Sequence, residues 1–243
     1  LLFTGPAASN LTFDCNGSTI APAEAGSKDA VQIRSQQQQQ QWQRPENLSL
    51  QRCRIEGSLR IMGMASNGEG AVLRTSSQQS GHTERAQAAA PSNIRLNQLT
   101  IIGQGRVPLY LDAESAHNRF TGNTIDSQTS NRELIAIDGS ANNQFSNNRF
   151  SSLNRGGIYL YRNCGEGGTI RHQAPSGNQI SGNTFFYRKY RGDLPAVWLG
   201  SRNGNRNYCQ ADAGYGFGSS ASDTDFADGN TVENNRIYRL SPQ

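Results

Sequence analysis

Residues that could do chemistry concentrate between Arg155 and Arg206 of this 243-residue chain. Eight basic residues fall in that segment, against two acidic ones, Glu166 and Asp193. A guanidinium binds a carboxylate or phosphate through two parallel hydrogen bonds, and the flat faces of Tyr and Trp stack on sugars or bases. The segment therefore predicts a face that binds an anionic polymer. The alternative is that its arginines are scattered around a solvated surface.

Proton transfer could also take place in this segment. Of the three histidines in the chain, His172 lies beside Arg171 within Cys164–Gly177. Removing a proton beside a uronate carboxylate needs a base, a proton donor and a cation. The candidate catalytic residues are His172, Arg162, Glu166 and Tyr187. The candidate substrate-binding residues are Arg171, Arg188, Lys189, Tyr190, Arg191, Trp198 and Arg202.

The assignment of His172 has an alternative. His172 could be an ordinary loop histidine. The other two histidines are not candidates, because His82 lies in a polar stretch expected to be exposed and His117 falls where a chain corner is expected. No assigned residue belongs to a known catalytic signature. The site residues are therefore hypotheses that only the fold can bring together.

The elements that must position these residues are set by a repeated phrase, Asn-x-apolar-x-x-Asn-x-apolar. It occurs in the second half of the chain at Asn118–Ile125, Asn143–Phe150, Asn178–Phe185 and Asn230–Ile237. The two apolar residues are always five positions apart, and both asparagines keep their places. A phrase repeated at a long, regular interval is typical of a solenoid, whose units bury their apolar residues against one another. The short spacing within each copy predicts a strand and a turn.

Weaker copies extend the pattern towards the start of the chain. They place Leu96 with Ile101 and Leu50 with Ile55 in the positions of Phe120 with Ile125, and an opening copy begins at Asn10. A second strand signal lies between copies, at Leu59–Ile61, Val107–Leu111, Ile135–Ile137, Ile158–Leu160 and Val197–Leu199. Each coil of about 24 residues therefore supplies at least two strands whose apolar residues face inward. Phe120, Phe145, Ile180 and Val232 are expected to form one inward column, and Ile125, Phe150, Phe185 and Ile237 a second.

Coils of this length with stacked asparagine corners resemble the right-handed parallel β-helix of pectate-lyase-like and mannuronan-epimerase-like proteins. The resemblance covers nearly the whole chain and implies an all-β solenoid of about seven to nine coils, one domain over residues 1–243. It does not extend to activity. The chain lacks the Asp-Asp and Gly-His-Gly signatures of polygalacturonases, the Arg-x-Pro-x-x-Arg stretch of pectate lyases and the Asp-Pro-His-Asp motif of mannuronan epimerases. No metal site or cofactor is predicted.

Insertions interrupt the later coils, where a binding face is expected. The interval between copies lengthens from Asn118–Asn143 to Asn143–Asn178 and again to Asn178–Asn230. Solenoid insertions map to loops on one face, often the binding face. The excursions Cys164–Gly177 and Tyr187–Asp228 fall in the basic, aromatic segment. The Gln36–Gln41 run is also an interruption and is expected to be a solvated loop without a function.

The four cysteines favour an oxidising compartment. Cys15 and Cys53 occupy nearly equivalent places in the first coils, and Cys164 and Cys209 flank the later excursions. We predict the disulfides Cys15–Cys53 and Cys164–Cys209, and hence a periplasmic or extracellular protein. Four buried free thiols are the alternative.

Two functions remain open from the sequence. One is a secreted or periplasmic protein that binds, and as an enzyme processes, an acidic polysaccharide by lyase, epimerase or hydrolase chemistry. The other is a non-catalytic glycan-binding, adhesin or spike-type β-helix. The pI near 9.0 would permit nucleic acid, but no nucleic-acid-binding motif is present and none is expected as partner. No apolar run reaches the roughly 20 residues that span a bilayer, and the start at Leu1 indicates a processed or trimmed chain.

Overall fold

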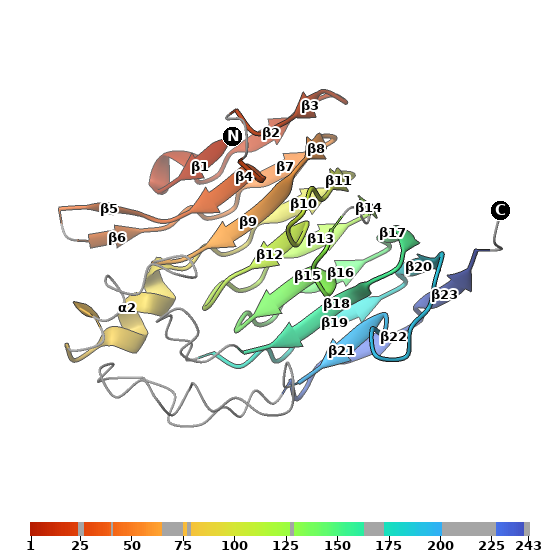
Figure 1. The fold of residues 1–243 in the computed structure, drawn as a ribbon. Coiled ribbons are helices and arrows are strands. Elements are labelled where there is room, and N and C mark those ends of the chain that lie inside the picture. Colours follow the sequence, from red (N-terminus) through yellow and green to blue (C-terminus); the bar gives the residue numbers. More distant parts are fainter. Residues whose placement is uncertain are drawn as a thin grey trace.

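Three parallel sheets, each of seven strands, wind into a solenoid (Figure 1). The computed structural model describes residues 1–23, 27–39, 41–64, 75–76, 79–126, 129–162, 173–200 and 227–240. Each described coil contributes one strand to each sheet, so about seven coils are present, as the repeat predicted. The expected right-handed parallel β-helix is confirmed.

The three sheets are called A, B and C in the order in which a coil visits them. Sheet A contains β1 (Leu2–Thr4), β4 (Asp29–Arg34), β9 (Ser58–Met62), β12 (Leu109–Leu111), β15 (Glu133–Asp138), β18 (Gly156–Tyr161) and β21 (Val197–Leu199). Sheet B contains β2 (Thr12–Asp14), β7 (Ser49–Gln51), β10 (Arg95–Asn97), β13 (Arg119–Thr121), β16 (Gln144–Ser146), β19 (Gln179–Ser181) and β22 (Thr231–Glu233). Sheet C contains β3 (Thr19–Ile20), β8 (Arg54–Glu56), β11 (Thr100–Ile102), β14 (Thr124–Asp126), β17 (Arg149–Leu153), β20 (Thr184–Tyr187) and β23 (Arg236–Arg239).

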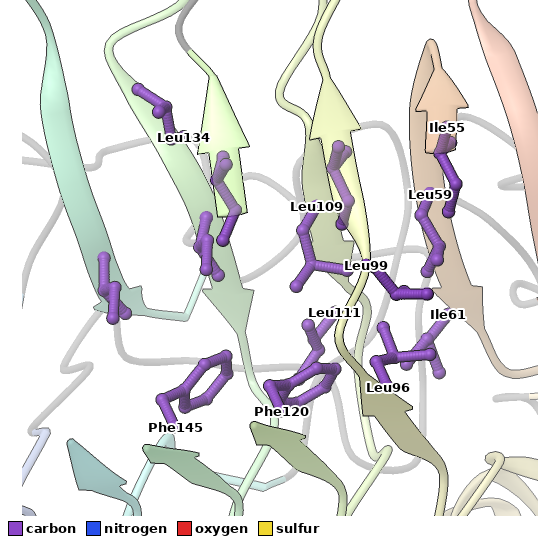
Figure 2. Packing of buried hydrophobic residues seen from close by; sticks show 14 of the residues in the cluster. Ile55, Leu59, Ile61, Leu96, Leu99, Leu109, Leu111, Phe120, Leu134 and Phe145 are labelled. Carbon is purple, nitrogen blue, oxygen red and sulfur yellow. The ribbon is translucent and has the colours of Figure 1, made fainter. Parts of the chain in front are cut away.

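The inward columns follow the repeat. On sheet B, Phe120 pairs in register with Phe145, and their rings stack at 4.5 Å. On sheet C, Phe150 and Phe185 stack at the same distance. Figure 2 shows Phe120 and Phe145 of sheet B beside aliphatic residues of sheet A such as Leu111. All four phenylalanines belong with these residues to one continuous core. Because every coil repeats the same positions, a narrow apolar column is enough to fill the interior.

The last coil differs from this expectation in its exposure. Val232 and Ile237 keep the predicted register with Ile180 and Phe185. Their side chains are nevertheless 41% and 53% exposed, whereas the earlier members of both columns are buried. In the described part of the chain no later coil packs on β22 and β23. The terminal coil therefore lacks the neighbour that buries the others.

Two ladders of asparagines hold successive coils together. At the corner between sheets B and C, Asn148 Oδ1 accepts hydrogen bonds from the backbone N–H and the Nδ2 of Asn123, and Asn183 does the same for Asn148. Asn235 continues this ladder in the last coil, where its Oδ1 accepts hydrogen bonds from Asn183. A second ladder, at the corner between sheets A and B, runs through Asn118, Asn143, Asn178 and Asn230. Coil-to-coil stacking thus satisfies amides that are otherwise costly to bury, as the repeat predicted.

The corner before sheet B needs a left-handed backbone in every coil. The residues there with positive φ are Asn10, Asn47, Asn93, His117, Asn142, Gly177 and Gly229. Asn and Gly are the residues that adopt this conformation most readily. The expectation that His117 is a corner residue is confirmed, and it is the one member of this column that is neither Asn nor Gly.

The described insertions leave the solenoid between sheet A and sheet B. The hairpin β5 (Gln36–Gln38) and β6 (Gln41–Gln43) follows β4, and the helix α2 (His82–Ala89) lies between β9 and β10. Both lie on the same side of the coils in Figure 1, where α2 packs on β6. The short helix η1 (Pro6–Ala8) occupies the same connection in the first coil.

The described residues of Gln36–Gln41 are mostly exposed, as expected, but they form a hairpin instead of a loop. Gln36, Gln37 and Gln38 pair antiparallel with Gln43, Trp42 and Gln41. Backbone pairing across the hairpin satisfies polar groups that a bare loop would leave to water. The half-buried Trp42 supplies an apolar side chain opposite Gln37. A glutamine-rich composition gave no sign of either feature.

The first predicted disulfide is present. Cys15 and Cys53 are bonded, and both are buried in the main core. Their bond joins the first two coils, next to the pairing of Phe13 with Leu50. Cys164 and Cys209 lie outside the described residues, so the second bridge stays a prediction.

Candidate functional site

The outward face of sheet A carries a row of mostly buried side chains, three of the five aromatic. One row across the strands reads Arg60, Tyr110, Ala136, Tyr159 and Trp198, each in register with the next. All except Trp198 are buried, although they point away from the core. The Arg60 guanidinium lies over the Tyr110 ring at 4.4 Å, and the Tyr159 and Trp198 rings are 5.7 Å apart.

Two carboxylates stand beside this row in neighbouring coils. Asp138 ends β15, and Asp112 directly follows β12; the residues before them, Leu111 and Ile137, are register partners. Adjacent strands are about 4.8 Å apart, so the fold places in space an acidic pair that the sequence lacks. Tyr110 donates a 2.6 Å hydrogen bond to Asp138 Oδ2, and Asp112 Oδ1 accepts the backbone N–H of Ala113 at 2.8 Å. Both carboxylates are fully buried.

A second polar group lies on the same face. Tyr161 donates to Glu133 Oε1 at 2.7 Å, and the Arg132 guanidinium pairs with Glu133 Oε2 at 3.0 Å. Arg132 also lies over the rings of Tyr159 and Tyr161. Burial, and then the charge of Glu133, raises the pKa of Tyr161 well above its usual value. This network holds Tyr161 protonated and fixed in place.

The fold brings together only some of the residues predicted from the sequence. Arg188, Lys189 and Tyr190 are exposed in the turn that leads from β20 to sheet A. In the described part of the chain neither Arg188 nor Lys189 has a carboxylate partner. Arg191 is also exposed, but it pairs with Asp193 at 2.6 Å. Trp198 stands on β21 of the same coil, half-buried on the outward face.

Tyr187 is positioned differently from a surface base. Its side chain is 1% exposed and belongs to the main core. Burial, and then the neighbouring Tyr190, raises the pKa of Tyr187, so its hydroxyl is a poor base at neutral pH. The Tyr187 and Tyr190 rings meet edge to face at 5.1 Å. Its contribution in the structure is to support Tyr190.

The remaining candidates can be placed only in part. Arg162 is half-buried and directly follows β18, at the carboxyl end of a sheet A strand. Arg188 lies in the turn before β21 and so leads to the amino end of a sheet A strand. Glu166, Arg171, His172 and Arg202 lie outside the described residues. Their roles stay predictions. Among the described residues no three His, Cys, Asp or Glu side chains are grouped to hold a metal ion.

Comparison with known proteins decides the family. The model of the right handed beta helix region matches residues 27–189, most of the chain. The chain belongs to the right-handed β-helix family. Curated proteins and solved structures gave no match to this β-helix protein. The pectate-lyase-like subtype is therefore not assigned by comparison.

The sequence did contain a signal for the buried acidic pair of this β-helix. Asp112 and Asp138 each follow an apolar-x-apolar strand signal, Leu109-x-Leu111 and Ile135-x-Ile137. Aligning the second strand of each coil, and not only the Asn repeat, puts the two residues in one column.

No helix in the described part of the protein is both long and apolar enough to cross a membrane.

Chemically, sheet A of the β-helix offers binding groups at its β20–β21 end and buried carboxyl groups at the carboxyl ends of β12 and β15. The accessible groups are the cations Arg188 and Lys189 and the rings of Tyr190 and Trp198. The carboxyl groups of Asp112 and Asp138 are of the type that catalyses glycoside cleavage. Because both are fully buried and bonded to neighbouring groups, the face is better arranged for binding than for turnover.

Proposed function

We propose that this β-helix protein binds an acidic polysaccharide at the β20–β21 end of sheet A. The observation that carries the proposal is that one turn and the strand after it present two exposed cations, the exposed ring of Tyr190 and the half-buried ring of Trp198. Arg188, Lys189 and Tyr190 come from the turn, and Trp198 comes from the strand. Sugar rings pack on aromatic faces, while uronate carboxylates pair with the cations.

Local charge favours an acidic over a neutral glycan. The exposed Arg239 guanidinium lies over the Tyr190 ring at 5.4 Å and adds a third cation. The nearby Asp193 is already neutralised by Arg191. None of Arg188, Lys189 and Arg239 has a carboxylate partner in the described ranges. A polyanion would gain from all three contacts without breaking an ion pair.

The rings form a support for bound sugars. Tyr190 rests on the buried Tyr187, and Trp198 rests on the buried Tyr159. Buried tyrosines packed against these two rings reduce the conformational entropy lost when a ligand binds. The Cys15–Cys53 disulfide further supports our proposal of a periplasmic or extracellular protein.

Processing of the polymer is proposed only as a second step. Lyase or epimerase chemistry would use His172, Arg162 and Glu166, and a hydrolase would use Asp112 with Asp138. A non-catalytic adhesin or spike would use the binding face alone. The burial of the acidic pair favours the binding role.

A glycan array that includes uronate and neutral polymers tests the binding proposal. Any polymer that binds should then be titrated calorimetrically at low and at moderate salt against Arg188→Ala/Lys189→Ala. We expect the double variant to lose about tenfold or more in affinity at low salt, with a smaller loss at higher salt because exposed charges are screened. Arg54→Ala, which removes an exposed arginine on sheet C, is the control. Binding only to neutral polymers, or unchanged binding in the double variant, would overturn the proposal.

An assay for unsaturated uronate on the bound polymer separates binding from lyase activity. His172→Ala should abolish any turnover while it leaves affinity nearly intact. Asp138→Asn should do the same for hydrolysis if the acidic pair is catalytic.

A further inference from the structure

A polar groove on sheet B lies apart from the sheet A face. It has a volume of about 380 Å³ and is lined by Asn93, Arg95, His117, Arg119, Asn142, Asn143, Gln144, Gly177 and Gln179. That volume falls within the ~300–1,000 Å³ of ligand pockets, although the lining is polar instead of apolar. It contains guanidinium, imidazole and amide groups and no carboxylate, so it suits a ligand that accepts hydrogen bonds.

Two arginines stand side by side in this groove. Arg95 and Arg119 are register partners on β10 and β13, and both are exposed. Their backbones are therefore about 4.8 Å apart, and like charges directly opposite each other destabilise a sheet. Within the described ranges neither arginine has a carboxylate partner. A bound anion would turn this repulsion into attraction.

His117 is the second unusual residue of the groove. It has a φ of 59° at the corner position that Asn93 and Asn142 fill in the neighbouring coils. Asn adopts this backbone with less cost than most residues and would serve the fold as well. His117 is exposed, two residues before Arg119, so its imidazole adds a donor next to the two guanidinium groups.

The two coils that follow Arg119 supply amides to the groove. Gly177 occupies the corner after Asn142, and a Cβ there would lie 2.4 Å from Asn142 Oδ1. The missing side chain leaves space for the Asn142 amide, while Gln144 and Gln179 follow Arg119 along the same outward row. The coils of Arg95 and Arg119 therefore supply the cations of the groove, and the next two coils supply only neutral groups.

We propose that this groove binds a tetrahedral oxyanion, a sulfate or phosphate group carried by a glycan. A planar carboxylate is already satisfied by the two parallel hydrogen bonds of one guanidinium. A tetrahedral group presents oxygens in several directions, so it can meet two guanidinium groups on successive coils and one imidazole. The amides beyond would contact hydroxyl groups of the attached sugar. The site does not depend on the acidic polysaccharide face of sheet A.

Thermal unfolding in sulfate and in chloride at matched ionic strength tests the site. A bound ion raises the Tm of the wild-type protein in sulfate, but sulfate also stabilises proteins generally. The informative quantity is therefore the rise in Tm from chloride to sulfate in the wild type minus the same rise in Arg119→Gln. Glutamine is chosen because Gln144 occupies the same position of the row in the next coil. We expect the rise in Tm from chloride to sulfate to be smaller in Arg119→Gln than in the wild type, while the Tm of the variant in chloride equals or exceeds that of the wild type.

Two further variants sharpen the comparison. His117→Asn restores the residue of the neighbouring corners, so it should fold at least as well and bind about tenfold more weakly. Arg236→Gln makes the same charge change on sheet C, far from the groove, and should bind as the wild type does. A rise in sulfate that is as large in Arg119→Gln and His117→Asn as in the wild type would overturn the site.

Calorimetric titration with different ligands identifies the source of the anion. Sulfate and phosphate should bind more tightly than acetate, and a sulfated or phosphorylated disaccharide more tightly than the free ion. Equal binding of acetate would overturn the tetrahedral assignment, and free ions that outbind the disaccharides would overturn the glycan. If short duplex DNA binds more tightly than the disaccharides and Arg119→Gln abolishes that binding, the ligand of the groove is a nucleic acid and the glycan proposal is overturned. Arg188→Ala/Lys189→Ala should change none of these results, so a failure here is distinct from one at sheet A.

Discussion

Asn123 and Asn148 occupy the same corner of successive coils, and the Nδ2 of Asn123 donates to Asn148 Oδ1 at 3.0 Å. Asn148 in turn donates to Asn183 Oδ1 and to the carbonyl oxygen of Phe120, each at 2.9 Å. One buried side chain therefore serves both neighbouring coils. This arrangement explains why the repeat keeps both asparagines although neither is apolar.

Asn148→Ala should lower the free energy of unfolding by about 3 kcal/mol or more. The substitution leaves the Asn123 N–H, the Phe120 carbonyl and the Asn183 Oδ1 with fewer partners, and each buried unsatisfied group costs about 1–3 kcal/mol. Denaturant unfolding measures the change. Asn97→Ala is the matched control, since Asn97 faces outward on sheet B and should change stability by less than about 0.5 kcal/mol. Similar losses in both variants would contradict a ladder role.

The Asn repeat predicted the ladder and the inward columns because both depend on one spacing that each coil copies. Phe120 and Phe145 meet since register follows from coil length. The acidic pair was missed because Asp112 and Asp138 come from the less regular second strand of the coil. Their proximity arises only when two coils stack, so no local motif contains it.

The sheet B groove was missed for a different reason. The sequence identified His117 as a corner residue, and that is correct. Arg95 and Arg119 belong to separate copies of the repeat, so they form no cluster along the sequence. The binding face was instead assigned to Arg155–Arg206, where basic residues are in excess. A charge count along the chain detects local clusters, whereas a parallel solenoid gathers charges that lie one coil apart.

Phe150→Ala should lower the free energy of unfolding by about 3–5 kcal/mol through lost transfer energy and the cavity that remains. The Phe150 ring is fully buried and stacks on Phe185. Phe186→Ala provides the control, because Phe186 points outward from β20 and stacks on Tyr238, which is 45% exposed. We expect the control to cost markedly less. Equal losses by chemical unfolding would show that Phe150 does not belong to a tightly packed column.

Replacing both Cys15 and Cys53 by Ser should lower stability by up to about 4 kcal/mol. The bond closes a loop with a sequence separation of 38, and the chain-entropy model assigns roughly that gain to a loop of this length. Unfolding of the wild type with and without reductant, beside the double variant, measures the effect. A reduced wild type that matches the oxidised one would contradict the stabilising role.

Thiol counting under denaturing, non-reducing conditions tests both bridges. Zero free thiols are expected if Cys164 and Cys209 also pair. Two would leave Cys15–Cys53 as the only bond, and four would refute both the pairing and the oxidising compartment.

Tyr161→Phe should flatten the loss of stability in alkaline solution. The Tyr161 side chain is 2% exposed, and burial followed by the Glu133 charge raises its pKa well above the value of about 10 expected in the unfolded chain. Because the folded pKa is the higher one, the unfolded state loses this proton first. The stabilisation is thus complete below about pH 10 and is lost as the pH rises towards the folded pKa.

Urea unfolding from neutral pH to about pH 11 measures this slope. At neutral pH, Tyr161→Phe should cost about 1–3 kcal/mol, since Glu133 loses a donor, but its stability should fall less steeply above about pH 10. Tyr238→Phe, at an exposed position, should retain the wild-type slope. An unchanged slope in Tyr161→Phe would mean that the hydroxyl ionises equally in the folded and unfolded states, which its burial beside Glu133 opposes.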